Sequence, residues 1–447
     1  MSFLRQRRLG RLVLIAALGL AGLVATLAIL NHRSETQERI AGLRAAGYPV
    51  TSVELDAWYE YPPADKNLAT PLLNAMGAFR FDKDDTNLPT LGRYREEPAG
   101  SPWSPRALDA ARECLAINSG ALARLHAALE RPKSRYPINL AKGYLATLAP
   151  LSIIRDAGRG LALEAIIAAK DNRPNEAVKA LLLAQHLADT LEAEPVLISY
   201  LVAVSIRGGN LKAAETVLSQ RGLSPTNLLQ LQEAFLASAA STSPERALAG
   251  EMANFLDWTG RRTPNVRDLD VLGFDKPEML AVYWALGLRH RDRRLAACYF
   301  DDLLAAQRLP ADQRSAAARG VEARLSHTLS AGRHPLASMM RPSGGHTTAK
   351  HASDLTRLRA AAAACALERF RQNAGRLPES LEALVPAYMA SVPTDAFTGR
   401  PLHFRQWDRG FVVYGVGENG ADDGGRPSER RPKQGDRRFD DTFTVSW

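Results

Sequence analysis

Three glycines near the C-terminal end match the pattern by which many proteins bind dinucleotides. Gly415, Gly417 and Gly420 form GxGxxG after a strand-like segment. The motif binds a pyrophosphate because a helix begins directly behind it and directs its N-terminus at the phosphates. Here the next residues, 421–425, read ADDGG. This acidic, glycine-rich run cannot begin a helix and would repel a phosphate, so the sequence excludes dinucleotide binding.

A second acidic cluster, Asp82, Asp84 and Asp85, has the beginning of an EF-hand calcium loop. Such a loop needs a glycine at its sixth position and a bidentate glutamate at its twelfth. With Asp82 as the first position, the sixth is Asn87 and the twelfth is Arg93. We interpret this stretch as a solvated loop.

Histidine and cysteine residues give no site of recognisable chemistry. His346, His351 and Asp354 have a spacing that would allow contact with a metal ion, but a polar cap at a helix start is the favoured interpretation. HExxH, GxSxG and Walker sequences are absent. The three cysteines are widely spaced and form no CxxC pair, which argues against a zinc site or a disulfide framework. We therefore predict no catalytic and no cofactor-binding residue.

The composition indicates a globular chain that does not act on nucleic acid. With 447 residues and 46% hydrophobic content, it is long enough for two or three domains whose cores fold without disulfides. Its net charge is +9, yet the basic residues are mostly arginines scattered among acids. No stripe of basic and aromatic residues is present, so we predict no nucleic-acid partner.

An uncharged apolar segment, residues 12–30, predicts a single transmembrane anchor. At about 1.5 Å per residue a helix of this length crosses a hydrocarbon core of roughly 30 Å. Arg5, Arg7, Arg8 and Arg11 precede it, which places residues 1–11 in the cytoplasm by the positive-inside rule. We predict an inner (cytoplasmic) membrane protein that contacts lipid through 12–30 and has its bulk outside the cytoplasm. A cleaved signal peptide is the alternative.

The exported part is predicted to be mostly α-helical. After a stalk and loop region at 31–103, a helical domain covers 104–334, and a linker at 335–346 precedes a C-terminal module at 347–447.

Within the helical domain, helices 160–170 and 175–191 flank the turn Asp171-Asn172-Arg173-Pro174. A second unit is expected to have its turn at Gly208-Gly209-Asn210. The spacing of the two turns is close to the roughly 34-residue period of tetratricopeptide repeats. Two units leave both a repeat array and an irregular bundle open.

The C-terminal module is predicted as a small α+β domain. A long alanine-rich helix begins at Thr347 or Thr348 and ends at Asn373-Ala374-Gly375. A short helix at 379–385 follows, and then two strands, 402–405 and 410–414, form a hairpin around Asp408-Arg409.

This module resembles the C-terminal region of the major pseudopilin of type II secretion systems. The resemblance is carried by residues of the turns and of the short helix in the same order: Asn373, Gly375, Pro378, Leu381, Leu384, Pro393, Asp395, Gly399, Pro401, Tyr414, Gly417 and Gly420. It implies a calcium ion in the acidic loop, with the ligands Asn419, Asp422, Asp423, Asp440 and Asp441. Asn419 stands where an aspartate is usual, and an unliganded solvated loop is the alternative.

The chain departs from a pseudopilin in its anchor, which lies more than three hundred residues upstream of the module. The leader motif of that family is also absent, so we predict no pilus subunit. The whole chain is similar to uncharacterised envelope proteins of planctomycete-type bacteria, a resemblance that implies no activity. We predict a membrane-anchored extracytoplasmic scaffold that binds protein partners and is linked to secretion or envelope assembly. The alternative is an envelope hydrolase or other enzyme with an unrecognised site in the helical region.

Overall fold

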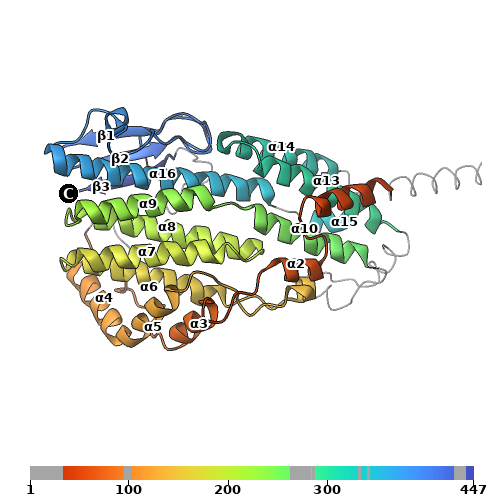
Figure 1. The fold of residues 1–447 in the computed structure, drawn as a ribbon, viewed down its shortest axis with the longest axis horizontal. Coiled ribbons are helices and arrows are strands. Elements are labelled where there is room, and N and C mark those ends of the chain that lie inside the picture. The colour runs from red at the N-terminus through yellow and green to blue at the C-terminus, as the bar shows by residue number, and fades with distance from the viewer. Residues whose placement is uncertain are drawn as a thin grey trace, which may run out of the picture.

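The computed structural model describes an elongated, mostly helical molecule with a small three-stranded antiparallel sheet near its C-terminus (Figure 1). This confirms the predicted fold class at that level. The described residues are 34–94, 102–261, 283, 287–330, 334–339, 343–426 and 439–447. The predicted anchor at 12–30 lies outside them. Among the described helices, none has the length and apolar content needed to cross a membrane.

The predicted stalk region is part of the folded body. A helix over residues 34–45 is followed by α2 (Ser52–Trp58) and α3 (Ala69–Gly77). Ile40 and Leu43 lie in a hydrophobic core with residues of α10 (Glu245–Gly260) and α13 (Arg289–Gln307). The segment after residue 34 therefore packs against helices that are more than two hundred residues away in the sequence.

A second hydrophobic core joins the N-terminal helices to the first helical hairpin. It contains residues of α3, α4 (Pro105–Ile117), α5 (Ser119–Leu129) and α6 (Leu151–Lys170), together with the 3-10 segment η1 (Leu140–Leu145). Ser104 caps α4 by accepting a hydrogen bond from the backbone N–H of Ala107 at 3.2 Å, and Pro105 supplies the first helical residue.

The predicted turn at 171–174 is confirmed as the connection between two packed helices, α6 and α7 (Pro174–Leu191). The predicted turn at Gly208-Gly209-Asn210 is wrong, because α8 runs unbroken from Leu197 to Ser219. A Cβ at Gly209 would meet nothing within 4 Å, so packing does not require a glycine there, and its place inside the helix costs backbone entropy. The chain instead turns after α8 into α9 (Pro225–Ser241), which packs against α16 and α7.

The residues that end α8 show why the chain turns there. Arg221 has a positive φ of 57°, and Ser224 and Asn227 form a capping box at the start of α9. Proline at the first helical position adds a preset φ. The turn therefore depends on capping residues and a left-handed residue, and the glycine pair before it has no part in it.

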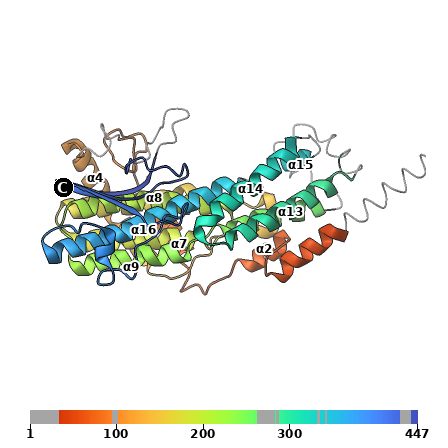
Figure 2. The same cartoon turned by 90° about the horizontal axis from the view of Figure 1, so that it is seen from above.

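The predicted boundary at 335–346 does not separate two cores. Residues 335–339 form α15 (Pro335–Met339), and α16 spans Gly344–Ala374, so it begins before the predicted Thr347. Figure 1 shows α16 beside the sheet and α9, and β3 contacts α8 directly, since the backbone N–H groups of Thr444 and Ser446 donate to side chains of α8. One core holds residues of α6 to α9, α16 and the sheet together. Helices α13 and α14 (Ala311–Ser330) occupy the half of the molecule away from the sheet (Figure 2).

The sheet contains the predicted β-hairpin. Strands β1 (His403–Trp407) and β2 (Gly410–Gly415) pair antiparallel, and β3 (Asp441–Ser446) pairs antiparallel with the other edge of β2. Phe443 and Val445 of β3 are completely buried in the core shared with α16. The predicted short helix at 379–385 is a 3-10 turn, η2 (Leu381–Leu384). The sheet and helices α8 and α9 are thereby fixed to one long helix, α16.

Candidate functional site

The acidic loop brings together some of the predicted calcium ligands. The carboxylate of Asp440 accepts hydrogen bonds from the backbone N–H groups of Asp423, Gly425 and Arg426 at 3.3, 2.7 and 3.1 Å. Asp422 accepts from the backbone N–H of Gly424 at 2.8 Å. These carboxylate oxygens thus hold the loop closed from within.

Asn419 and Asp423 form an exposed pair in the same loop. The amide of Asn419 donates to Oδ2 of Asp423 at 2.8 Å, and its Oδ1 accepts from the backbone N–H of Ala421 at 3.0 Å. In the described part of the chain, no three His, Cys, Asp or Glu side chains are arranged to hold a metal ion.

Asp441 points away from this loop, as strand alternation requires of a neighbour of Asp440. Its Oδ1 accepts a hydrogen bond from the hydroxyl of Ser353, while its Oδ2 is buried without a partner. Burial raises the pKa of Asp441 to about 6, against the hydrogen bond from Ser353 that lowers it. Of the five predicted ligands, Asp441 therefore contacts α16 rather than the acidic loop.

The prediction that His351 and Asp354 form a polar cap at a helix start is wrong. Both residues lie inside α16 and are buried. Nδ1 of His351 is 3.0 Å from the hydroxyl of Tyr200, and Asp354 accepts from Nε of Arg207 at 2.6 Å. His346 is exposed. His351 and Asp354 therefore join α16 to α8 and form no open site.

Arg207 is the centre of a buried cluster of charges. Its side chain is 0% exposed and forms ion pairs with three carboxylates, on Asp189 at 3.1 Å, on Asp354 at 2.6 Å, and on Glu192. It also donates to the hydroxyl of Thr242 at 3.1 Å. Burial alone would lower the pKa of Arg207, but the three carboxylates raise it well above its usual value. The guanidinium is therefore permanently charged and binds α7, α8 and α16 to one another.

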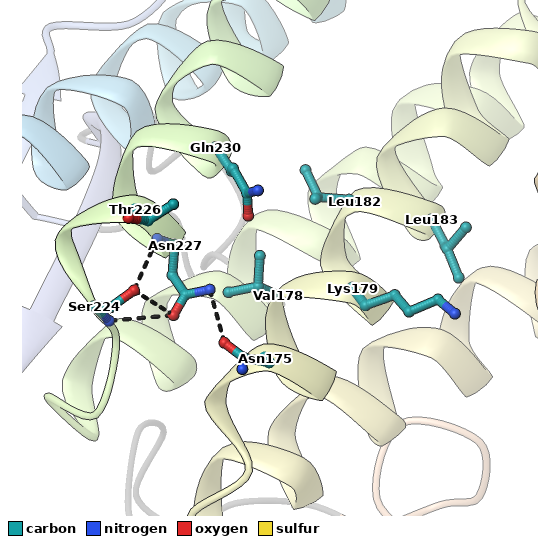
Figure 3. Close-up of a pocket in the computed structure, with 9 residues that line it drawn as sticks. All are labelled: Asn175, Val178, Lys179, Leu182, Leu183, Ser224, Thr226, Asn227 and Gln230. Carbon is teal, nitrogen blue, oxygen red and sulfur yellow. Dashed lines mark hydrogen bonds between the residues drawn. The ribbon is translucent and has the colours of Figure 1, made fainter.

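A solvent-open groove lies between the first turns of α7 and α9. The two helices run in the same direction, because Asn227 donates to Asn175 at 3.1 Å near their starts and Gln185 donates to Ser238 at 2.7 Å further along. The hollow has a volume of about 530 Å³ and is lined by Asn175, Val178, Lys179, Leu182, Leu183, Ser224, Thr226, Asn227 and Gln230 (Figure 3).

The groove has a fixed polar wall. Asn227 is 7% exposed, and its Oδ1 accepts from both the backbone N–H and the hydroxyl of Ser224, at 3.2 and 2.8 Å. Its amide nitrogen donates to Asn175, so the two helix starts are linked by side chains already held in place. Such a preformed surface binds a ligand without first having to order itself.

Comparison of the chain with family models, with curated proteins and with solved structures found no match.

The sequence alone does not predict this groove. Its two walls come from segments about fifty residues apart, and each reads as an ordinary helix start, RPNEAVK at 173–179 and SPTNLLQ at 224–230. The available signal was the asparagine shortly after a proline in both segments. This signal indicates a shared site only once the fold is known to bring the starts of α7 and α9 together.

Proposed function

We propose that this chain is a membrane-anchored extracytoplasmic interaction protein that docks a protein partner in the groove between α7 and α9. The observation that carries the proposal is the place of the groove. It lies at the end of the elongated body that bears the C-terminus, whereas the helix over residues 34–45 lies at the other end (Figure 1). An anchor at 12–30 would directly precede that helix, so the groove would face away from the membrane.

The packing of α6 to α9 supports a scaffold role. α7 packs against α6, α8 and α9, and both α8 and α9 pack against α16. Stacked helical hairpins commonly present a binding surface made of residues from several units. We infer that α6 to α9 form one packed set of helices whose outer surface carries the docking groove.

Photo-crosslinking tests this proposal. A photoreactive amino acid in place of Gln230, which is exposed on the groove wall, is expected to give a discrete adduct of the full-length protein in its own membrane. The partner is then identified by mass spectrometry of the adduct. Illumination that leaves the protein uncrosslinked at this position would contradict docking in the groove.

For the acidic loop we propose a calcium-stabilised, pseudopilin-like module linked to secretion or envelope assembly. The support is that Asp422, Asp423 and Asp440 already lie around one loop, where calcium would relieve the repulsion between them. A ligand that binds only the folded state must stabilise it. The thermal midpoint of the full-length protein is therefore expected to rise in millimolar calcium and to stay unchanged in the same concentration of magnesium. An equal midpoint with and without calcium would contradict the proposal.

A further inference from the structure

The lining of the groove carries one kind of charge. Among its nine residues, Lys179 is the single ionised side chain and is exposed on α7. It forms no ion pair with the described residues, in contrast to Lys212 on α8, which pairs with Glu215 at 2.9 Å. An exposed ammonium next to a hollow without a carboxylate is complementary to an anionic group on whatever fills the hollow.

The other polar groups of the groove favour an anion or a carbonyl oxygen. Asn175 uses its Oδ1 to accept from Asn227, which leaves its NH₂ as a donor. Gln230 supplies a further amide, and Thr226 a hydroxyl. The starts of α7 and α9 add the partial positive charge of two helix N-termini at the same place.

The floor of the groove is apolar and indicates that the ligand is more than a small anion. Val178 is buried at the base, and Leu182 and Leu183 are half-buried beside it. A hollow with apolar residues at its base and amide groups on its wall fits an extended peptide, whose backbone carbonyls accept from the amides while one side chain packs on the apolar base. Glu233, exposed one turn beyond Gln230, disfavours a long run of acids.

Resting on the function proposed above, we propose that the partner enters the groove as an extended peptide segment in which an aspartate or glutamate contacts Lys179 and a neighbouring apolar side chain packs against Val178 and Leu182.

Peptide binding to the full-length protein in nanodiscs tests this assignment. The probes are two fluorescein-labelled decapeptides of leucine and serine that carry either one central glutamate or glutamine in its place. At low salt, fluorescence anisotropy is expected to show the glutamate peptide binding about fivefold more tightly, since a partly exposed ion pair contributes about 1 kcal/mol. The preference should shrink as salt is raised, because ions screen an exposed pair.

Two lysine variants provide the matched comparison. Lys179→Ala is expected to remove the preference for glutamate, whereas Lys350→Ala, at another exposed lysine on a helix, should leave it unchanged. Equal binding of the two peptides, no binding of either, or a preference that survives Lys179→Ala would overturn the assignment. Crosslinking from Gln230 does not depend on this charge. An adduct without a glutamate preference would refute the acidic ligand alone, and missing adducts would refute docking itself.

Discussion

Replacing Arg207 with methionine is expected to lower the free energy of unfolding by about 3–5 kcal/mol, because it leaves buried carboxylates without their cation. The side chain is 0% exposed, and the side chains of Asp354 and Glu192 are only 2% and 11% exposed. Water cannot replace the guanidinium there. The measurement is urea-induced unfolding of the full-length protein in detergent, compared with the unsubstituted chain.

Two further variants make the comparison specific. Arg44→Met removes an exposed pair with Glu54, whose side chains are 54% and 37% exposed, and should cost less than about 1 kcal/mol. Adding Asp354→Asn to Arg207→Met removes one of the carboxylates that were left without a cation, and should restore part of the lost stability. If Arg207→Met were no more destabilising than Arg44→Met, the cluster would not hold the helices together.

Acidification is expected to destabilise the fold through His351. Burial, followed by the charges of Arg207, Arg314 and Arg359, lowers the pKa of His351 to about 3. The unfolded chain takes up this proton near pH 6.5, whereas the folded chain resists it, so the stability present above pH 6.5 is lost as the pH falls toward 3. The loss amounts to about 3 kcal/mol between pH 6.5 and pH 4.

His351→Gln isolates this contribution. Glutamine has no titrating group but still offers an oxygen to the hydroxyl of Tyr200. Buried acids act in the opposite direction, since burial raises the pKa of Glu194 to about 7, and their stabilising effect is lost as the pH rises. Subtracting the two proteins cancels such groups. The free energy of unfolding of His351→Gln should fall by about 3 kcal/mol less between pH 6.5 and pH 4. Parallel pH profiles would contradict a buried neutral imidazole.

Local signals predicted the elements that are fixed by their own residues. The α6–α7 turn follows from Asp171-Asn172-Arg173-Pro174, in which Asn172 takes a positive φ of 57°. The end of α16 follows from Gly375, whose φ of 71° closes the helix. The β1–β2 hairpin follows from two aromatic strands around a polar turn.

Elements that depend on distant residues were not predictable in this way. Gly208-Gly209 reads as a turn, but the helix is maintained because Arg207 and Asn210, on either side, are buried against other helices. The supposed linker and module boundary failed for a related reason. The alanine-rich face of α16 packs against α9 and α8, and no local feature of an alanine-rich helix says which partner it will contact.

The candidate sites show the same limit. Acidic residues close in sequence predicted a calcium loop, yet whether they converge depends on backbone direction, and Asp440 and Asp441 point to opposite sides of one strand. The groove needed two separate helix starts side by side. Arg207 carried no signal of its role, because an arginine within a helical pattern usually lies on the solvated face.

The proposed docking of a partner in the groove, at an end remote from the proposed anchor, is tested most directly by crosslinking in right-side-out spheroplasts. The photoreactive residue is placed at Gln230 in one sample and at Gln313, an exposed glutamine on α14, in the other. We expect one extracytoplasmic protein to be joined to the chain from position 230 and not from 313, with the adduct retained in membranes washed at alkaline pH. Adducts that form equally from both positions, that contain a cytoplasmic protein, or that wash off the membrane would contradict the account.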